Sequence, residues 1–188
     1  MTNNYVHPIA LSQQNSTLQT LEQTLPSDFE KSIAFIEQIG ITIIFKNIEA
    51  ATLLPGLSIE DGCINIDKQR LLFPGDVLHE AGHIAVIPAS ERQTLNSENI
   101  DRRQDAAAEE MMAIAWSYAV CLHLQIDPCF VFHENGYKGS ASHIVDNFKQ
   151  GNYFGVPMLQ WVGMALERKS ETEPEKPFYP AMLQWVRN

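Results

Sequence analysis

Residues 73–86 read FPGDVLHEAGHIAV, and the interpretation of the whole chain depends on this stretch. The Pro-Gly pair near its start interrupts whatever precedes it, and Asp76 can cap the amides of a helix that begins with Val77. The helix should end before Pro88, because proline disfavours the helical conformation of the residue ahead of it. The sequence therefore predicts one short helix that carries the pentapeptide HEAGH.

The pentapeptide HEAGH contains two histidines four residues apart. Residues at this spacing share one face of a helix, so the imidazoles of His79 and His83 can bind one ion at about 2.0–2.1 Å each. Glu80 follows the first histidine and can accept the proton of a metal-activated water without binding the metal itself. This pattern predicts a Zn²⁺ site with His79 and His83 as metal ligands and Glu80 as the catalytic base.

The third metal ligand must come from another part of the chain, because Ala89 stands where one family of such motifs has its third histidine. The next long helix, expected over residues 101–123, carries Glu109 and Glu110 in a largely apolar run. Carboxylates in such a run are costly unless they are paired or bound to metal. Helical periodicity does not choose between the two, and we favour Glu110.

The segment before HEAGH predicts one helix and a small sheet. A capping-box pattern, Ser27 with Glu30, starts a helix over residues 28–39. The β-branched run 41–45 predicts a mostly buried strand. In residues 57–66 an Asp-Gly pair between two apolar runs predicts a hairpin. We therefore expect an α+β fold, with a small, mostly antiparallel sheet packed on a helical zincin-like core. Shorter helices are expected over 140–150 and 157–168.

Composition limits the possible partners and the domain organisation. The chain has 188 residues, 45% of them hydrophobic, and a formal net charge of −10. An acidic chain repels nucleic acid and anionic membrane surfaces, so we expect neither as a partner. The sequence shows no signal peptide and no apolar run long enough to span a membrane, so we expect a cytoplasmic protein. We predict a flexible tail over residues 1–17 and a single domain over 18–188.

The order of these parts resembles the ImmA/IrrE family of small zinc metallopeptidases. The resemblance covers roughly residues 28–122 and depends on the HExxH helix, its upstream strands, and a Glu followed by an apolar residue and Ala in EEMMAIA. It implies a gluzincin-like site in which His79, His83 and Glu110 are ligands and Glu80 is the general base. It also implies hydrolysis of peptide bonds, often in a repressor or another regulatory protein.

A competing resemblance is to the peptidase domain of FtsH-type membrane proteases, which also contain HEAGH. That resemblance implies an Asp as third ligand, and Asp146 is the candidate. No ATPase segment or membrane span accompanies the motif here. The strands ahead of HEAGH also fit the ImmA/IrrE family better.

The sequence leads to one main hypothesis and two alternatives. We expect a zinc metallopeptidase acting on a protein or peptide substrate, and the sequence does not indicate its oligomeric state. One alternative is a catalytically silent metal-binding module that engages a protein partner, and the other is a structural domain without metal. His133, Tyr137 and His143 lie in a polar segment where a donor could stabilise an oxyanion opposite the metal.

Overall fold

The computed structural model describes residues 26–168 and 177–188, so the tail predicted for residues 1–17 lies outside the described residues. Within the described ranges the chain forms five α-helices and one three-stranded sheet, which confirms the α+β class. The helices are α1 (Asp28–Gln38), α2 (Asp76–Val86), α3 (Ala106–Leu124), α4 (Ala141–Lys149) and α5 (Val156–Trp161). The strands are β1 (Ile43–Phe45), β2 (Leu57–Glu60) and β3 (Cys63–Ile66).

Helix α1 begins at the predicted capping box. The Ser27 hydroxyl accepts the Glu30 amide at 3.2 Å, and the Glu30 carboxylate accepts the Ser27 amide at 2.8 Å. Two orphan amides of the first turn are thereby satisfied, which fixes where the helix starts. The helix buries Phe35 and Ile36 against the core.

The sheet has the order β1-β3-β2 and is mixed. Strands β2 and β3 form the predicted hairpin, whose turn residues Asp61 and Gly62 have φ angles of 50° and 69°. Strand β1, however, pairs with β3 in parallel. The prediction of a mostly antiparallel sheet is therefore wrong, because β1 joins the hairpin beside its second strand and runs in the same direction as that strand.

Strand β1 is also less buried than predicted for residues 41–45. It includes three of these residues, and Ile44 and Phe45 keep 42% and 47% of their surface exposed. The run lies at an edge of the sheet, where apolar β-branched residues need not be covered on both faces. At the opposite edge, Ser97 donates its amide to the Ile59 carbonyl at 3.0 Å and accepts the Ile59 amide on its hydroxyl at 2.7 Å.

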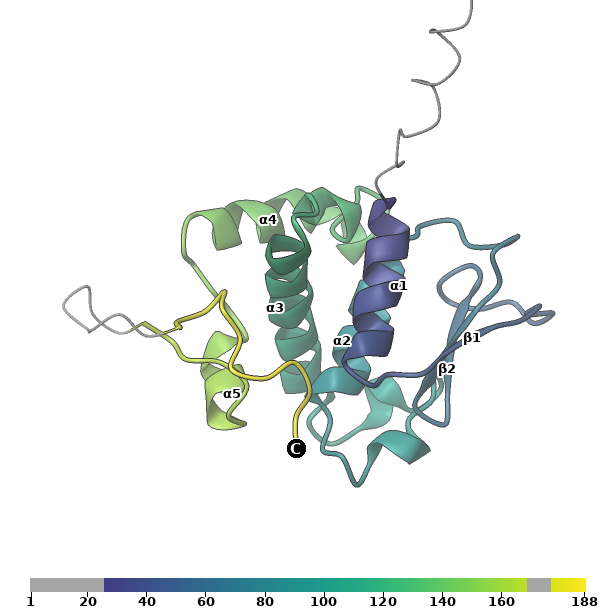
Figure 1. Cartoon of the computed structure of the whole chain (residues 1–188), viewed down its shortest axis with the longest axis horizontal. Helices are drawn as coiled ribbons and strands as arrows, with labels where there is room; N and C mark the ends of the chain where they lie inside the picture. Colours follow the sequence, from purple (N-terminus) through teal and green to yellow (C-terminus); the bar gives the residue numbers. More distant parts are fainter. Residues whose placement is uncertain (1–25, 169–176) are drawn as a thin grey trace, which may run out of the picture.

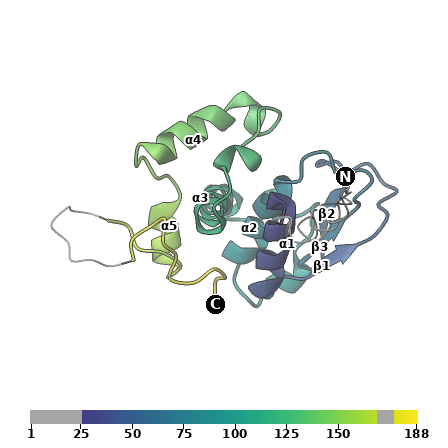
Figure 2. The ribbon, with the colours of Figure 1, turned by 45° about the horizontal axis from the view of Figure 1, so that its top comes forward.

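Helix α2 lies at the centre of the molecule, between the sheet and α3 (Figures 1 and 2). Every residue of α2 other than His79 is buried. The two helices pack closely at Gly82, since a Cβ atom there would lie 3.1 Å from the Ala113 carbonyl oxygen of α3. Small residues on α2 thus allow the two helix backbones to come together.

Both ends of α2 differ in detail from a simple capped helix. The N-cap is Gly75, and the Asp76 side chain makes no capping bond. It pairs instead with His133 at 2.9 Å, so the predicted capping role of Asp76 is wrong. The helix ends at Val86, ahead of Pro88, as predicted.

Two other predicted helices are shorter in the structure. Helix α3 starts at Ala106 rather than at residue 101, and a separate 3₁₀ turn occupies Ile100–Arg102. Helix α5 ends at Trp161, well before the predicted residue 168, and Gly163 then adopts a φ of 76°. A left-handed glycine shortly after the last helical turn is a common way for a helix to end.

The C-terminal segment returns to the two central helices. The indole of Trp116 on α3 is fully buried and donates to the Trp185 carbonyl at 2.8 Å. The amide of Arg187 donates to the Ala85 carbonyl at the end of α2, also at 2.8 Å. These contacts attach the chain end to the helices that carry the candidate site (Figure 1).

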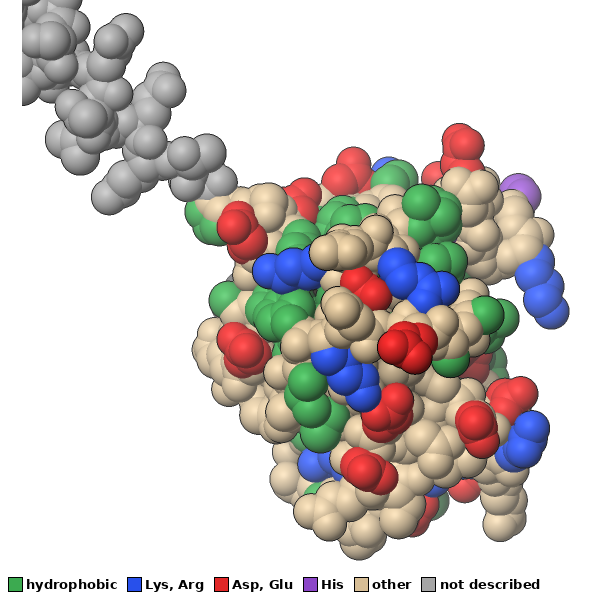
Figure 3. Space-filling view, turned by 90° about the vertical axis from the view of Figure 1, so that its right-hand side faces the viewer, with side chains coloured by type: hydrophobic (Ala, Val, Ile, Leu, Met, Phe, Trp, Pro, Cys, Tyr) green, Lys and Arg blue, Asp and Glu red, His purple; other side chains and the backbone are tan. Residues whose placement is uncertain are grey.

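The helices and the charged surface bear on possible membrane and nucleic-acid contacts. Among the helices of residues 26–168 and 177–188, none has the length and apolar composition needed to cross a membrane. On the face of the molecule drawn in Figure 3, acidic and basic side chains of the described residues are interspersed rather than gathered into a basic patch.

The start of α2 provides a test of the packing. A Cβ atom at Gly75 would overlap the Phe130 carbonyl. We expect Gly75→Ala to lower the free energy of unfolding by about 2 kcal/mol or more, because a backbone segment must move. Gly136→Ala is the matched control, since Gly136 has a φ of −93° and no atom nearer than 3.4 Å to the added carbon. Equal stability of the two variants in urea unfolding would contradict the packing described here.

Candidate metal centre

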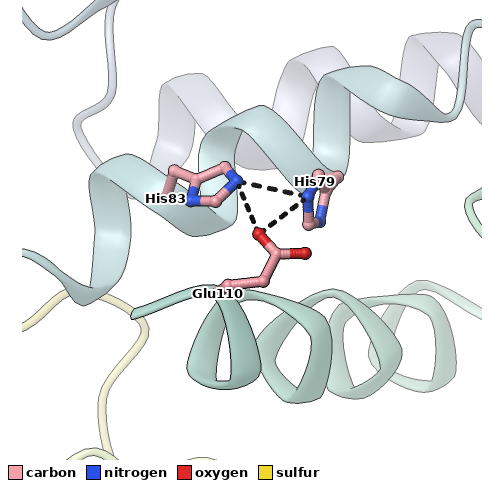
Figure 4. A group of neighbouring side chains, drawn as sticks. All are labelled: His79, His83 and Glu110. Carbon is pink, nitrogen blue, oxygen red and sulfur yellow. Dashed lines mark hydrogen bonds and ion pairs between the residues drawn. The ribbon is translucent and has the colours of Figure 1, made fainter. Parts of the chain in front are cut away.

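Two central helices bring three potential metal ligands together (Figure 4). The Nε2 atoms of His79 and His83 lie 3.2 Å apart on α2. The Oε2 atom of Glu110, which projects from α3, lies 3.6 Å from the first nitrogen and 3.2 Å from the second. The close contact between α2 and α3 therefore determines where the carboxylate meets the imidazoles.

The three separations match a face of a tetrahedral coordination sphere. Ligand atoms bound at 2.0–2.1 Å in tetrahedral geometry are about 3.3–3.4 Å from one another. The observed distances of 3.2, 3.2 and 3.6 Å lie close to this spacing. The cluster of His79, His83 and Glu110 could hold a metal ion.

The structure distinguishes between the three carboxylates that were candidates for the third metal ligand. Glu109 is 5% exposed and forms a bidentate pair with Arg103, at 2.7 and 3.0 Å. Asp146 is exposed on α4 and is not part of the cluster. Glu110 alone among the three lies with the histidines.

The choice between the two neighbouring glutamates follows from their different partners. Helical periodicity does not distinguish Glu109 from Glu110, since each lies on an apolar stripe of the helix. The distinguishing signal was a basic residue, Arg103, which lies just before the helix and neutralises Glu109. A buried carboxylate with a bidentate guanidinium partner is already satisfied, so it is not free to bind a metal.

Glu110 and His83 shift each other's pKa toward the charged form. Burial opposes ionisation of Glu110, but hydrogen bonds to His79 and His83 outweigh it and hold the pKa of this carboxyl well below its usual range. Burial likewise lowers the pKa of His83, yet the Glu110 carboxylate and the charge of Glu80 raise it above its ordinary value overall. The carboxylate thus stays ionised at neutral pH, as a metal ligand must be.

Glu80 lies beside the cluster without belonging to it. Its side chain is on α2, one residue after His79, and the residue is only 9% exposed. Its charge raises the pKa of both His83 and Tyr137, which places it near the cluster. Within residues 26–168 and 177–188 the Glu80 carboxylate forms no hydrogen bond or ion pair. It is therefore free to accept a proton.

The segment after α3 covers the N-terminal half of α2. The Nε2 atom of His133 is hydrogen-bonded to the Oδ1 atom of Asp76 at 2.9 Å. The His133 ring also stacks on Phe73, with 4.1 Å between the ring centroids. The Tyr137 ring packs edge-on against the His79 ring, 5.4 Å between centroids. The sequence predicted a donor in this segment, but it did not predict the contact between Asp76 and His133.

The other histidines lie elsewhere. His143 is exposed on α4. His123, near the end of α3, packs against the rings of Phe35 and Trp185. The Nδ1 atom of His79 is buried without a hydrogen-bond partner in the described part of the chain, so this ring interacts with its polar neighbours through Nε2.

Metal affinity tests the assignment of the third ligand. We expect Glu110→Gln to weaken zinc binding by more than about 100-fold, beyond the 10–100-fold typical of residues that only surround a ligand. Glu109→Gln and Asp146→Asn are the controls and should change the affinity by less than about 10-fold. The measurement is competition with a chromophoric chelator. Zinc binding that survives Glu110→Gln but not Glu109→Gln would overturn the assignment.

The pair of Glu110 and His83 also predicts a pH dependence for the metal-free protein. The lowered pKa of Glu110 contributes stability above about pH 4.3 that is lost as the pH falls through the folded value. The raised pKa of His83 contributes stability below about pH 6.5 that is lost as the pH rises through its folded value.

The stability lost on Glu110→Gln should therefore be larger at pH 5.5 than at pH 8.5. Urea unfolding with a chelator present measures the difference. An equal loss at the two pH values would show that the two groups are not coupled.

Comparisons of this chain with models of protein families, with curated proteins and with solved structures found no match. The ImmA/IrrE resemblance and the zincin-like core therefore stay predictions from the sequence. The geometry of His79, His83 and Glu110 is what indicates a function for this chain.

Proposed function

We propose that this chain is a zinc-dependent metallopeptidase that hydrolyses peptide bonds in a protein or peptide substrate. The observation that carries the proposal is the convergence of His79, His83 and Glu110 at tetrahedral spacing. Two imidazoles and one carboxylate are the ligand set of thermolysin-type catalytic zinc sites. The resemblance to ImmA/IrrE peptidases supports the same activity and favours a regulatory protein as the substrate.

The exposure of the cluster supports a catalytic site over a closed structural one. The Glu110 side chain keeps 43% of its surface exposed, whereas His83 keeps 8%. The cluster is thus open to solvent on the side of the carboxylate. A catalytic zinc site needs such an open fourth position, and a structural site fills it with a fourth protein ligand.

His79, His83 and Glu110 would hold the zinc ion, which would supply a water activated at neutral pH and would polarise the substrate carbonyl. Glu80 accepts the proton of the attacking water and transfers it to the nitrogen of the leaving amine. Its carboxylate suits this task because it lies beside His79 and has no competing partner among the described residues. The Glu110 carboxylate keeps its charge throughout, since the two histidines favour its ionised form.

A substitution of Glu80 tests its proposed role as the general base. We expect Glu80→Gln to bind zinc as the wild type does and to lose peptide hydrolysis by about 10²–10⁴-fold, because the general base is removed while the ligands remain. Glu37→Gln, an exposed position on α1, is the control and should keep full activity. The assay follows cleavage of casein and of mixed-sequence quenched fluorescent peptides.

Three outcomes separate the alternatives to a peptidase. A wild type that binds zinc but cleaves none of these substrates would favour the catalytically silent metal-binding module. Undiminished cleavage by Glu80→Gln would remove Glu80 from the mechanism. A protein that binds no zinc would leave only the structural domain.

A further inference from the structure

We propose that Tyr137 is a second catalytic residue, whose hydroxyl donates a hydrogen bond to the carbonyl oxygen of the scissile peptide as negative charge develops there. This inference rests on the proposed peptidase function. It is carried by the position of the ring, by the contacts that anchor its segment on α2, and by a hydroxyl that has no hydrogen-bond partner among residues 26–168 and 177–188.

The Tyr137 ring lies at the candidate site. Its plane is inclined by 75° to that of His79, with 5.4 Å between the centroids, and Phe132 supports it from another side at 5.2 Å. The ring therefore lies beside a ligand of the candidate metal site, on the same side of α2 as His79.

The segment that carries Tyr137 is anchored on α2 rather than loosely placed. The pair of His133 and Asp76 joins it to the first residue of α2, and the stacking of His133 on Phe73 adds a second contact. The adjoining backbone fits against Gly75 closely enough that a Cβ atom there would overlap it. These contacts attach the segment that carries Tyr137 to the start of α2.

The backbone at Tyr137 is itself unusual. Both Tyr137 and Lys138 have a φ of 53°, in the left-handed region that residues with a Cβ atom rarely adopt. The turn is held by hydrogen bonds from the Gly139 amide to the Gly136 carbonyl and from the Ser140 amide to the Tyr137 carbonyl. Strained backbone next to a candidate active site is commonly associated with the positioning of a functional side chain.

Two other possible donors near the cluster have acidic partners, and the Nδ1 atom of His133 is buried away from solvent. Arg103 is paired with Glu109 and Glu91, and His133 is paired with Asp76. His143 is exposed on α4. The Tyr137 hydroxyl, in contrast, donates to no acceptor in residues 26–168 and 177–188. It is thus available to donate to a bound substrate.

The chemistry assigned to Tyr137 leaves its own covalent bonds intact. Addition of a water oxygen to the peptide carbon moves an electron pair onto the carbonyl oxygen, and Glu80 takes the proton of that water. Breaking the carbon–nitrogen bond returns the electron pair, and the proton on Glu80 passes to the nitrogen, which leaves as an amine. Tyr137 only donates a hydrogen bond to the charged oxygen, which stabilises the transition state more than the neutral carbonyl.

The first test is Tyr137→Phe, which removes the hydroxyl and keeps the ring against His79 and Phe132. We expect unchanged zinc content and thermal stability, a KM within about threefold of the wild type, and a kcat lower by about 10²–10³-fold. Tyr153→Phe is the matched control, because its ring packs on Phe148 and Tyr179, away from the cluster. A kcat equal to that of the wild type would overturn the proposal.

A second measurement does not depend on turnover. Methylphosphonate offers tetrahedral oxygens to a hydrogen-bond donor, whereas azide does not. We expect Tyr137→Phe, loaded with Co²⁺, to bind methylphosphonate about tenfold more weakly than the wild type and azide equally well, as followed by visible absorption.

The two measurements separate this inference from the proposed function. Unchanged methylphosphonate affinity would overturn the role of Tyr137 even if the wild type cleaves peptides. Failure of peptide cleavage in the wild type, with the loss of methylphosphonate affinity still observed, would contradict the peptidase proposal and retain Tyr137 as the donor at this site.

Discussion

The close packing of α2 against α3 determines the geometry of the candidate site. Glycine at position 82 lets the backbone of α2 approach Ala113 and the ring of Trp116 on α3. At this separation the carboxylate of Glu110 reaches the imidazoles of α2, within 3.2 Å of the nearer one. A larger residue at position 82 would have to displace these atoms by a few tenths of an ångström, and the ligand spacing would change with them.

Three acidic side chains around the candidate site, Glu109, Glu110 and Asp76, each have a specific basic or imidazole partner. Two successive glutamates on α3 differ in exposure, since Glu109 is buried and Glu110 keeps 43% of its side chain exposed, and each has a partner that compensates its charge. Glu109 obtains one in Arg103, and Glu110 obtains one in the histidines. One turn before His79 on α2, Asp76 is satisfied by His133. Each pairing also joins separate chain segments, so the same contacts that neutralise charge hold the site together.

Local features of the sequence predicted much of the fold and part of the site. The capping box of α1, the Asp-Gly hairpin and the face shared by His79 and His83 all follow from short-range geometry. The pairing of β1 with β3 does not, because nothing in a strand's own sequence says which edge of a hairpin it joins. The choice between Glu109 and Glu110, and the approach of Tyr137 to His79, likewise depend on contacts between distant segments.

The central claim is that one zinc ion is bound by ligands from both α2 and α3. A crystal structure of the zinc-loaded protein, with anomalous diffraction collected on both sides of the zinc absorption edge, tests it directly. The account predicts one anomalous peak about 2.0–2.2 Å from the Nε2 atoms of His79 and His83 and from a carboxylate oxygen of Glu110. A peak bound by the histidines together with a different protein ligand, or no peak between α2 and α3, would contradict it.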